Sequence, residues 1–539
     1  MMKNKFNIFY TLLSVTVIVA SVYLGFKLGV NRALMSNVGI EVKTPVTKIN
    51  KILQLISDRY VDSISIDELV ESSIPLIVEQ LDPHSTYFVP EDLKVLDESL
   101  QGSFEGVGIS FNMTTDTIVV INVIEGGPAN RSGVEAGDRI IRIDDSIVAG
   151  KKMDSNDVMK MLRGEAGTKV SIDIQRKGFD KEIPIIITRA KIPVKSVDVS
   201  YMINDSIGFI KLSTFSRTTY NEFIAAATKL KKQGMKKLII DLRSNTGGYM
   251  DQAIKIADEF FSEKVLIVYT EGYNYPRENF YSPGKGRLAD IDVNIIINEI
   301  TASASEIVSG AIQDNDRGTI VGRRSFGKGL VQIPIPFSDG SGLNLTVGRY
   351  HTPTGRCIQK PYDKGLEQYN HDLFDRLLNN EFFAADNIQF NDSLKYTTPK
   401  GKTVYGGGGI MPDIFVAFDT IESAQDFFSK ISQKNLVYNF VMNYTDRNRE
   451  TINKITNFEQ LDDFLGTQNI FDTFLNYAAA NGINAKNSEL AEVKKILEPE
   501  LKGLIGRNTP LDNEGFYPYY GKIDVTLQKA IECFTEIEE

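Results

Sequence analysis

Hydrophobic positions change their spacing several times along this chain of 539 residues. Apolar residues recur at helical spacing through residues 49–60 and again through residues 66–81, which predicts two amphipathic helices. We expect these helices to form an amino-terminal helical cap over residues 41–92. The next hundred or so residues show short β-type runs broken by turn signals, with one helix-like stretch at residues 155–164. Residues 93–190 are therefore predicted to form a compact β-rich module.

From residue 206 onward, apolar strand-like runs alternate with amphipathic helical runs. Such an alternation is typical of a layered α/β core, which we expect over residues 196–418. Beyond about residue 418 the spacing becomes helical again, so residues 421–539 are predicted to form a carboxy-terminal helical domain. The predicted fold class is thus α/β, with a layered strand–helix core, an inserted β-rich domain, and helical parts at both ends.

One uncharged stretch precedes these domains. Residues 8–26 carry no charge and follow two lysines. As a helix with a rise of about 1.5 Å per residue they would span about 28 Å, close to the hydrocarbon thickness of a bilayer. A cleaved signal peptide is the alternative, but the stretch is long and no clear A-x-A site follows it. We expect an uncleaved membrane anchor within residues 1–30, which the nearly balanced flanking charges do not orient.

Composition narrows the classes of partner. The net charge of -10 and the pI near 5.2 argue against a nucleic-acid-binding protein, which needs a basic surface. Cys357 and Cys533 are the only cysteines and form no CxxC pattern, so neither a disulfide framework nor a zinc site is indicated. Any polymer that the chain binds is expected to be protein.

The segment GRRSFGKG, residues 322–329, matches the GxxxxGK pattern of a phosphate-binding loop. Gly329 stands where a serine or threonine would hold Mg²⁺. The following residues contain Pro334 and Pro336 and are typical of a strand, whereas that loop must open a helix. The pattern therefore does not predict a nucleotide site.

A run of small residues, TASASE, stands where a predicted strand ending at Asn298 gives way to a helix. This places Ser303 or Ser305 at the start of the helix. Helix starts carry unpaired N–H groups and a partial positive charge, so an oxyanion formed there would be stabilised. The alternative is that these serines only cap the helix. A nucleophilic serine also needs a base.

Three histidines and one lysine are candidate bases. His84 lies in the turn-like segment LDPHSTYF, and His371 lies in a polar stretch that we interpret as an insertion. His351 follows a predicted strand and stays open as a base. A Ser-Lys pair is a recognised substitute for the Ser-His-Asp triad. Lys328 stands between two glycines and two apolar runs, where desolvation would lower the pKa of its ammonium group.

Together, these segments resemble the carboxy-terminal processing, or tail-specific, peptidases. TASASEIVSGAIQD followed by SFGKGLVQ resembles the motifs that carry the nucleophilic serine and, 25 residues later, the lysine base of that family. The resemblance implies that Ser303 is the nucleophile and Lys328 the base, and that Gln332 orients the lysine.

The segment DLRSNTGGYMDQA, which begins at Asp241, resembles the DLRxNxGG segment of the same family. The resemblance implies that an amide of Gly247 or Gly248 joins the Ala304 amide in an oxyanion hole. LDPHSTYF, RYHTPTGRCIQ and GIMPDI also resemble family segments, so the likeness extends over roughly residues 45–418. Two parts depart from it, namely the stretch between Ile358 and Lys402 and the carboxy-terminal helical domain.

The β-rich module is PDZ-like, because FEGVGISF and GGPANRSGVEAGDRI both resemble PDZ segments. Its strand at residues 109–111 could pair with an extended peptide, and an apolar protein tail is the expected ligand. Successive N–H groups of a glycine-containing turn could bind the carboxylate of that tail. The turn consists of Gly106, Val107, Gly108 and Ile109, and the candidate side-chain contacts on the adjacent helix are Val158, Met159, Met161 and Leu162.

Together with the uncharged stretch at residues 8–26, the resemblance implies a membrane-anchored serine endopeptidase that binds protein tails and cleaves them without a metal or an organic cofactor. It also implies a single-pass protein of the inner membrane with its catalytic part in the periplasm, the alternative being a secreted or periplasmic protein released by signal cleavage. The rival function is a catalytically inactive PDZ-containing peptide-binding scaffold. A second rival is a serine hydrolase that uses His351 as its base.

Overall fold

The computed structural model describes residues 17–27, 44–113, 116–418 and 424–535. The chain forms two compact units, residues 1–76 and 77–539.

In the first unit, α2 (Pro45–Arg59) follows Thr44, whose side chain accepts a hydrogen bond from the N–H of Thr47. α3 (Ile66–Val78) follows α2 along the chain. Of the uncharged stretch at residues 8–26, residues 8–16 lie outside the described residues, and residues 17–27 are helical. No helix within the described ranges is both long and apolar enough to cross a bilayer.

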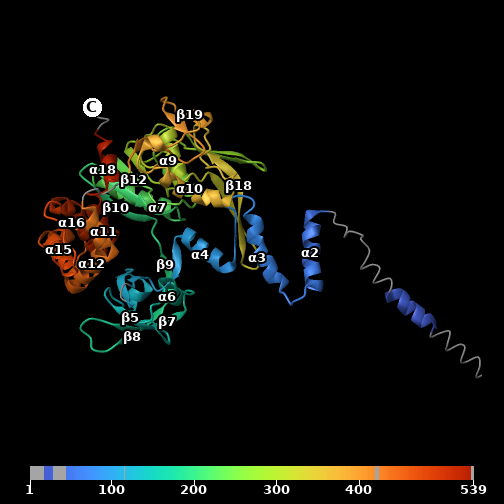
Figure 1. The fold of residues 1–539 in the computed structure, drawn as a ribbon. Helices are drawn as coiled ribbons and strands as arrows, with labels where there is room; N and C mark the ends of the chain where they lie inside the picture. The colour runs from blue at the N-terminus through green and yellow to red at the C-terminus, as the bar shows by residue number, and fades with distance from the viewer. Residues whose placement is uncertain (1–16, 28–43, 114–115, 419–423, 536–539) are drawn as a thin grey trace, which may run out of the picture. The chain divides into compact units, whose positions relative to one another are not determined.

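The second unit is built around a sheet of six strands (Figure 1). In spatial order these are β10 (Val197–Met202), β11 (Ile207–Leu212), β12 (Lys237–Asp241), β15 (Asp292–Ile297), β16 (Gly318–Gly322) and β21 (Ile414–Phe415). β10 pairs antiparallel with β11, and all other neighbours are parallel. The predicted α/β core is thereby confirmed.

Helices cover both faces of this sheet, because successive strand residues point to opposite sides. Ile210 and Ile240 belong to a core cluster that includes residues of α7 (Thr219–Lys232), α8 (Met250–Asp258) and α9 (Ala304–Asp314). Their strand neighbours Phe209 and Ile239 belong to another cluster, together with residues of α18 (Val525–Glu532) and the following Phe534. The carboxy-terminal helix therefore completes the core of the sheet (red in Figure 1).

A second sheet carries β17 (Leu330–Pro336), which pairs with β18 (Gly342–His351). Its other strands are β1 (Thr86–Phe88), β13 (Leu266–Gly272) and β14 (Tyr275–Tyr281). The stretch interpreted as an insertion contains α10 (Leu366–Leu378), the 3₁₀ turns Ala385–Asn387 and Asp392–Leu394, and β19 (Lys395–Thr397), which pairs with β20 (Thr403–Tyr405).

The β-rich module has its own apolar core, with Ile140 and Ile172 fully buried. Its sheet has the order β3-β4-β5-β7-β8, with β6 paired to β5, so β3 is an edge strand. The elements are β3 (Ile109–Asn112), β4 (Ile118–Val123), α5 (Pro128–Arg131), β5 (Arg139–Ile143), β6 (Ser146–Ile147), α6 (Ser155–Leu162), β7 (Lys169–Gln175) and β8 (Ile183–Thr188).

A two-stranded ribbon of β2 (Ser103–Gly106) and β9 (Ala190–Pro193) stands where the chain enters and leaves this module. α4 (Pro90–Gln101) precedes the ribbon, so the boundary that the sequence placed between residues 92 and 93 falls inside a helix. The module itself is inserted between β1 and β10, as the sequence predicts.

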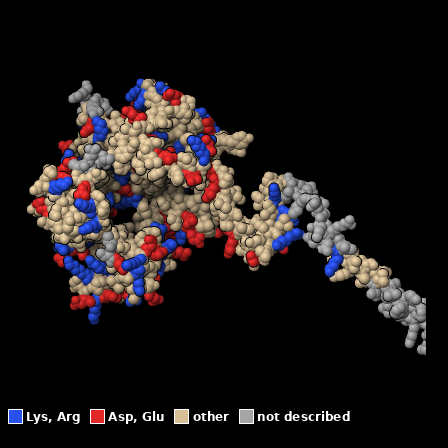
Figure 2. Space-filling view, in the orientation of Figure 1, with Lys and Arg blue, Asp and Glu red and all other residues tan. Residues whose placement is uncertain are grey.

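The carboxy-terminal part is helical and has a separate core that includes Phe440, Phe474 and Leu497. Its helices before α18 are α11 (Gln425–Gln433), α12 (Leu436–Arg447), α13 (Arg449–Ile452), α14 (Phe458–Gly466), α15 (Ile470–Ala480), α16 (Leu490–Arg507) and α17 (Asn513–Tyr520). Figure 2 shows basic and acidic side chains interspersed over the visible face of the molecule.

Candidate active site

Three loops of the six-stranded sheet carry the residues that the sequence singled out. The loop after β12 contains Gly247 and Gly248, the loop after β15 contains Ser303, and the loop after β16 contains Lys328. β12, β15 and β16 are neighbouring parallel strands. Because the carboxyl ends of such strands meet at one edge of a sheet, the three loops converge there.

Ser303 is the N-cap residue of α9 and has φ 57° and ψ -117°, a conformation that residues other than glycine rarely adopt. All residues of α9 are buried, whereas Ser303 is only half-buried. A Cβ atom at position 247 would lie 2.8 Å from Ser303 Cβ and 2.9 Å from Ala304 N. Glycine at 247 therefore lets the β12 loop approach the serine closely.

Glu306 joins the serine loop to the lysine loop. Its Oε2 accepts hydrogen bonds from the N–H of Ser303 at 2.8 Å and from the N–H of Lys328 at 2.9 Å. Its Oε1 accepts from the N–H of Gly327 at 2.8 Å and from Ser325 Oγ at 2.5 Å. The side chain is fully buried, and burial raises the pKa of Glu306 to about 7 while the four donors oppose this rise.

Tyr350 on β18 is a second connection between the same two loops. Its Oη lies 2.6 Å from the carbonyl oxygen of Lys328 and 3.1 Å from that of Ser303, so the two acceptors share one proton. Burial raises the pKa of Tyr350 far above its ordinary value, which keeps the phenol a donor. Neither Glu306 nor Tyr350 was predicted from the sequence, although S-x-x-E at residues 303–306 has the form of a capping box.

Lys328 has the electrostatic setting of a base. Burial lowers the pKa of its ammonium group, against the opposing charges of Glu306 and Asp82. Burial and then the charge of Lys328 lower the pKa of His84 to about 4, so this imidazole is neutral near pH 7. Among the described residues, no hydrogen bond joins Lys328 Nζ to Ser303 Oγ.

Gln332 does not contact the lysine side chain through a hydrogen bond. Its Nε2 donates to Thr346 Oγ1 at 3.2 Å, and Thr346 Oγ1 donates in turn to Asp82 Oδ1 at 3.0 Å. A register shift between Val331 and Gln332 interrupts the β17–β18 ladder at this position. The structure thus gives Gln332 a partner that the sequence did not indicate.

The two glycines of the β12 loop differ in their N–H groups. The buried Gly247 donates its N–H to Asn245 Oδ1 at 2.9 Å. Gly248 is exposed, and its N–H donates to no other residue in the described parts of the chain. The N–H of Ala304 is similarly unengaged there. Of the two candidates, Gly248 therefore has the available donor.

The histidines lie elsewhere or have other partners. The ring of His351 stacks on Tyr269 at a centroid distance of 4.6 Å, and its Nδ1 lies 3.1 Å from the carbonyl oxygen of Gly355. His84 Nε2 lies 2.7 Å from the hydroxyl of Tyr369, and His371 is exposed on α10. None of these imidazoles forms a hydrogen bond with Ser303 within the described ranges.

The β-rich module offers an open strand edge beside a turn with unused donors. The N–H groups of Val107 and Gly108 donate to no other described residue, and β3 pairs only with β4. One sequence prediction needs correction, because Val158 and Leu162 are buried in the core of the module. These two residues lie four positions apart and so share the inner face of α6.

On the same helix, Met159 is 39% exposed and Met161 is partly buried. These methionines are the accessible members of the predicted contact set. Gly106 lies in β2, where it pairs with Ala190, and Ile109 begins the edge strand β3.

Family models match three parts of this chain. Peptidase family S41 matches residues 206–367, a PDZ domain matches residues 106–187, and a family of unknown function matches residues 427–509. The solved structure of a photosystem II D1 C-terminal processing protease aligns with 70% of this chain and 94% of its own, at 25% identity and a TM-score of 0.35.

Two curated relatives match the sequence over most of their length. Carboxy-terminal processing protease CtpB of Bacillus subtilis is 34% identical over 351 residues, which cover 65% of this chain and 71% of the relative. The carboxy-terminal-processing protease of Bartonella bacilliformis is 37% identical over 319 residues, 58% of this chain and 72% of the relative. The chain belongs to the carboxy-terminal processing serine proteases of peptidase family S41 and carries their PDZ domain.

Proposed function

We propose that this protease cleaves its substrates by a Ser-Lys mechanism in which Ser303 is the nucleophile and Lys328 the general base. The observation that carries this proposal is the single buried carboxylate of Glu306, which accepts hydrogen bonds from the backbone N–H groups of both residues. Two residues whose backbone N–H groups bind one acceptor atom have their backbones close together, so their side chains can reach one another. The lowered pKa of Lys328 supports its role as an uncharged amine.

In the proposed reaction, the neutral amine of Lys328 removes the proton of Ser303 Oγ as this oxygen attacks a peptide carbonyl. The N–H groups of Ala304 and Gly248 stabilise the oxyanion. Lys328 then gives the proton to the leaving amine, and the acyl-enzyme is hydrolysed by a water that Lys328 deprotonates. Catalytic hydrogen bonds that are absent without substrate can form in the complex. Gln332 would orient Lys328 in that state after leaving Thr346.

The PDZ domain supplies substrate capture in this proposal. An extended tail adds a strand to the open edge of β3, and its terminal carboxylate accepts hydrogen bonds from the N–H groups of Val107 and Gly108. Met159 and Met161 on α6 offer flexible apolar contacts, which suit apolar tails.

For location, we propose a single-pass protein of the inner membrane with its catalytic part in the periplasm. The support is the uncharged stretch at residues 8–26, of which residues 17–26 are helical. Release by signal cleavage is the alternative. The competing function for the whole chain is a peptide-binding scaffold without activity.

The choice of base is tested by three alanine variants assayed on a peptide with a free apolar tail. We expect Ser303→Ala and Lys328→Ala to lose at least about 1,000-fold in kcat, since both groups act on the reacting atoms. His351→Ala should keep kcat within about two-fold of wild type, because His351 contacts Tyr269 and Gly355 and not the serine. Full turnover by Lys328→Ala would refute the lysine base, and a wild type that binds but never cleaves would favour the scaffold.

The pH profile of kcat/KM tests the electrostatics of the site. Since the base must be uncharged, kcat/KM should rise with pH through the pKa of Lys328, which burial lowers from its ordinary value. In Glu306→Gln the rising part of the pH profile should move to lower pH, because the substitution removes a negative charge that favours the ammonium form of Lys328. The plateau should fall about 100-fold, because an amide cannot accept from all four donors. If kcat/KM rises over the same pH range in Glu306→Gln as in wild type, Glu306 does not influence the pKa of Lys328.

Tail recognition is tested with two peptides of identical sequence, one with a free and one with an amidated carboxy terminus. We expect kcat/KM to be at least about 10-fold higher for the free tail, because hydrogen bonds to a charged acceptor contribute about 1.5–3 kcal/mol each. The Ser303→Ala variant should also bind the peptide with the free carboxy terminus more tightly than the amidated peptide, and it should cleave neither. Equal cleavage of the two peptides would exclude carboxylate capture.

Location is tested by fractionating cells that express the full-length chain. We expect the protein in the membrane fraction after carbonate extraction. Protease added to spheroplasts, but not to intact cells, should digest the catalytic core. A shortened protein in the soluble periplasmic fraction would instead support signal cleavage.

A further inference from the structure

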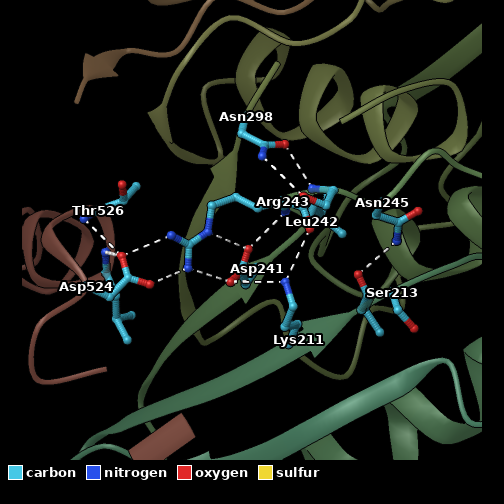
Figure 3. A network of polar contacts seen from close by, with 12 residues as sticks. Lys211, Ser213, Asp241, Leu242, Arg243, Asn245, Asn298, Asp524 and Thr526 are labelled. Carbon is cyan, nitrogen blue, oxygen red and sulfur yellow. Dashed lines mark hydrogen bonds and ion pairs between the residues drawn. The ribbon is translucent and has the colours of Figure 1, made fainter. Parts of the chain in front are cut away.

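An arginine between two carboxylates connects the carboxy-terminal domain to the catalytic core (Figure 3). Arg243 stands two residues after the end of β12, in the loop that leads to Gly248. Its guanidinium donates to Asp241 at 3.0 Å through Nε and at 2.7 Å through Nη2. It also donates to both oxygens of Asp524, through Nη1 at 2.9 Å and Nη2 at 2.5 Å. Asp524 is the N-cap residue of α18.

This group of charges is shielded from solvent. The side chain of Asp241 is fully buried, and those of Asp524 and Arg243 are 7% and 21% exposed. Lys211 Nζ lies 3.4 Å from Asp241 Oδ2 and donates to the carbonyl oxygen of Arg243, so two cations face two carboxylates. Burial would raise the pKa of Asp241, but the charges of Arg243 and Lys211 hold it at about 2. Bidentate pairs of this kind fix the plane of the guanidinium.

The loop after Arg243 reaches both sides of the catalytic serine. Ser244 has φ 62° and donates its N–H to Asn298 Oδ1 at 2.9 Å. The carbonyl oxygen of Asn245 accepts from the N–H of Ala302 and from Ser305 Oγ, each at 3.0 Å. Ala302, immediately before Ser303, and Ser305, two residues after it, are thus bound to one carbonyl of this loop. Gly247 is bound to the side chain of the same Asn245.

We propose that Asp524 is a positioning residue for proteolysis, which acts through Arg243 to fix the loop that carries Gly248. The inference rests on the proposed function, because it assigns a role in the oxyanion hole to that loop. If the contact with Asp524 is lost, the guanidinium of Arg243 still binds Asp241 along one edge. Its other edge is then no longer held, so the side chain can change its orientation. The carboxy-terminal domain thereby contributes a residue that orders the active site, although this domain lies outside residues 206–367, which match peptidase family S41.

Asp524 also caps α18, since its Oδ1 accepts from the N–H groups of Thr526 and Leu527, each at 3.1 Å. Asparagine is as good an N-cap as aspartate, so Asp524→Asn keeps the cap and removes the charge. α18 has further attachments to the sheet, because Asn294 Nδ2 donates to the carbonyl oxygen of Ala530 at 2.8 Å and Phe534 is buried in the shared core. The helix should stay in place in this variant.

The test compares full-length wild type, Asp524→Asn and Asp426→Asn. Asp426 is the matched control, since it forms an exposed ion pair with Lys430 in the same domain. We expect Asp524→Asn to lower kcat about 10-fold with KM within about two-fold, because displacement of an oxyanion donor by a fraction of an ångström affects the transition state more than binding. The control should match wild type. In Arg243→Gln, adding Asp524→Asn should cause no further loss.

Hydrogen exchange of backbone amides gives a second readout that does not need activity. We expect faster exchange at residues 242–248 in Asp524→Asn, with exchange in α18 unchanged. If wild type does not cleave peptides, the proposed function fails, and this exchange result still decides whether Asp524 orders the loop. Wild-type kcat together with unchanged loop exchange would overturn the inference. Faster exchange throughout α18 would also overturn it, because Asp524 would then act only on helix docking.

Discussion

The arrangement of this protease depends on one buried carboxylate. Glu306 accepts hydrogen bonds from the backbone of Ser303, Gly327 and Lys328 and from the side chain of Ser325, and it does so at the first turn of a fully buried helix. Hydrogen bonds to a charged acceptor contribute about 1.5–3 kcal/mol each. The strained backbone conformation of Ser303 and the partial desolvation of Lys328 both cost free energy. The four hydrogen bonds to Glu306 offset this cost, because they hold the two loops that carry these residues.

The parallel sheet brings the partners of this carboxylate together. β12, β15 and β16 end side by side, and each is followed by a loop with one part of the site. The face of the sheet opposite α9 is covered by α18, at the far end of the sequence. The same carboxy-terminal segment places Asp524 against Arg243. One carboxy-terminal segment thus supplies both the core packing and the contact of Asp524 with Arg243, through which we propose that it orders the site.

The α/β core, the PDZ domain and the family could be predicted because they depend on local patterns, namely strand–helix alternation and short glycine-containing motifs. Contacts between distant segments could not. No sequence spacing predicts the contact of Tyr350 with Ser303 or that of Asp524 with Arg243, because those pairs form only after the sheets assemble. Gln332 was predicted beside Lys328 and has Thr346 as its partner, since a register shift in β17 decides where its side chain points.

A crystal structure of the full-length chain with a peptide boronate bound would test the assignment of Ser303 and Lys328, because boronates mimic the tetrahedral intermediate of acyl transfer. We expect a covalent bond to Ser303 Oγ, Lys328 Nζ within hydrogen-bonding distance of that oxygen, and a boronate oxygen held by the N–H groups of Ala304 and Gly248. Boron on another residue, or a lysine that remains out of reach while Glu306 keeps its four hydrogen bonds, would contradict it.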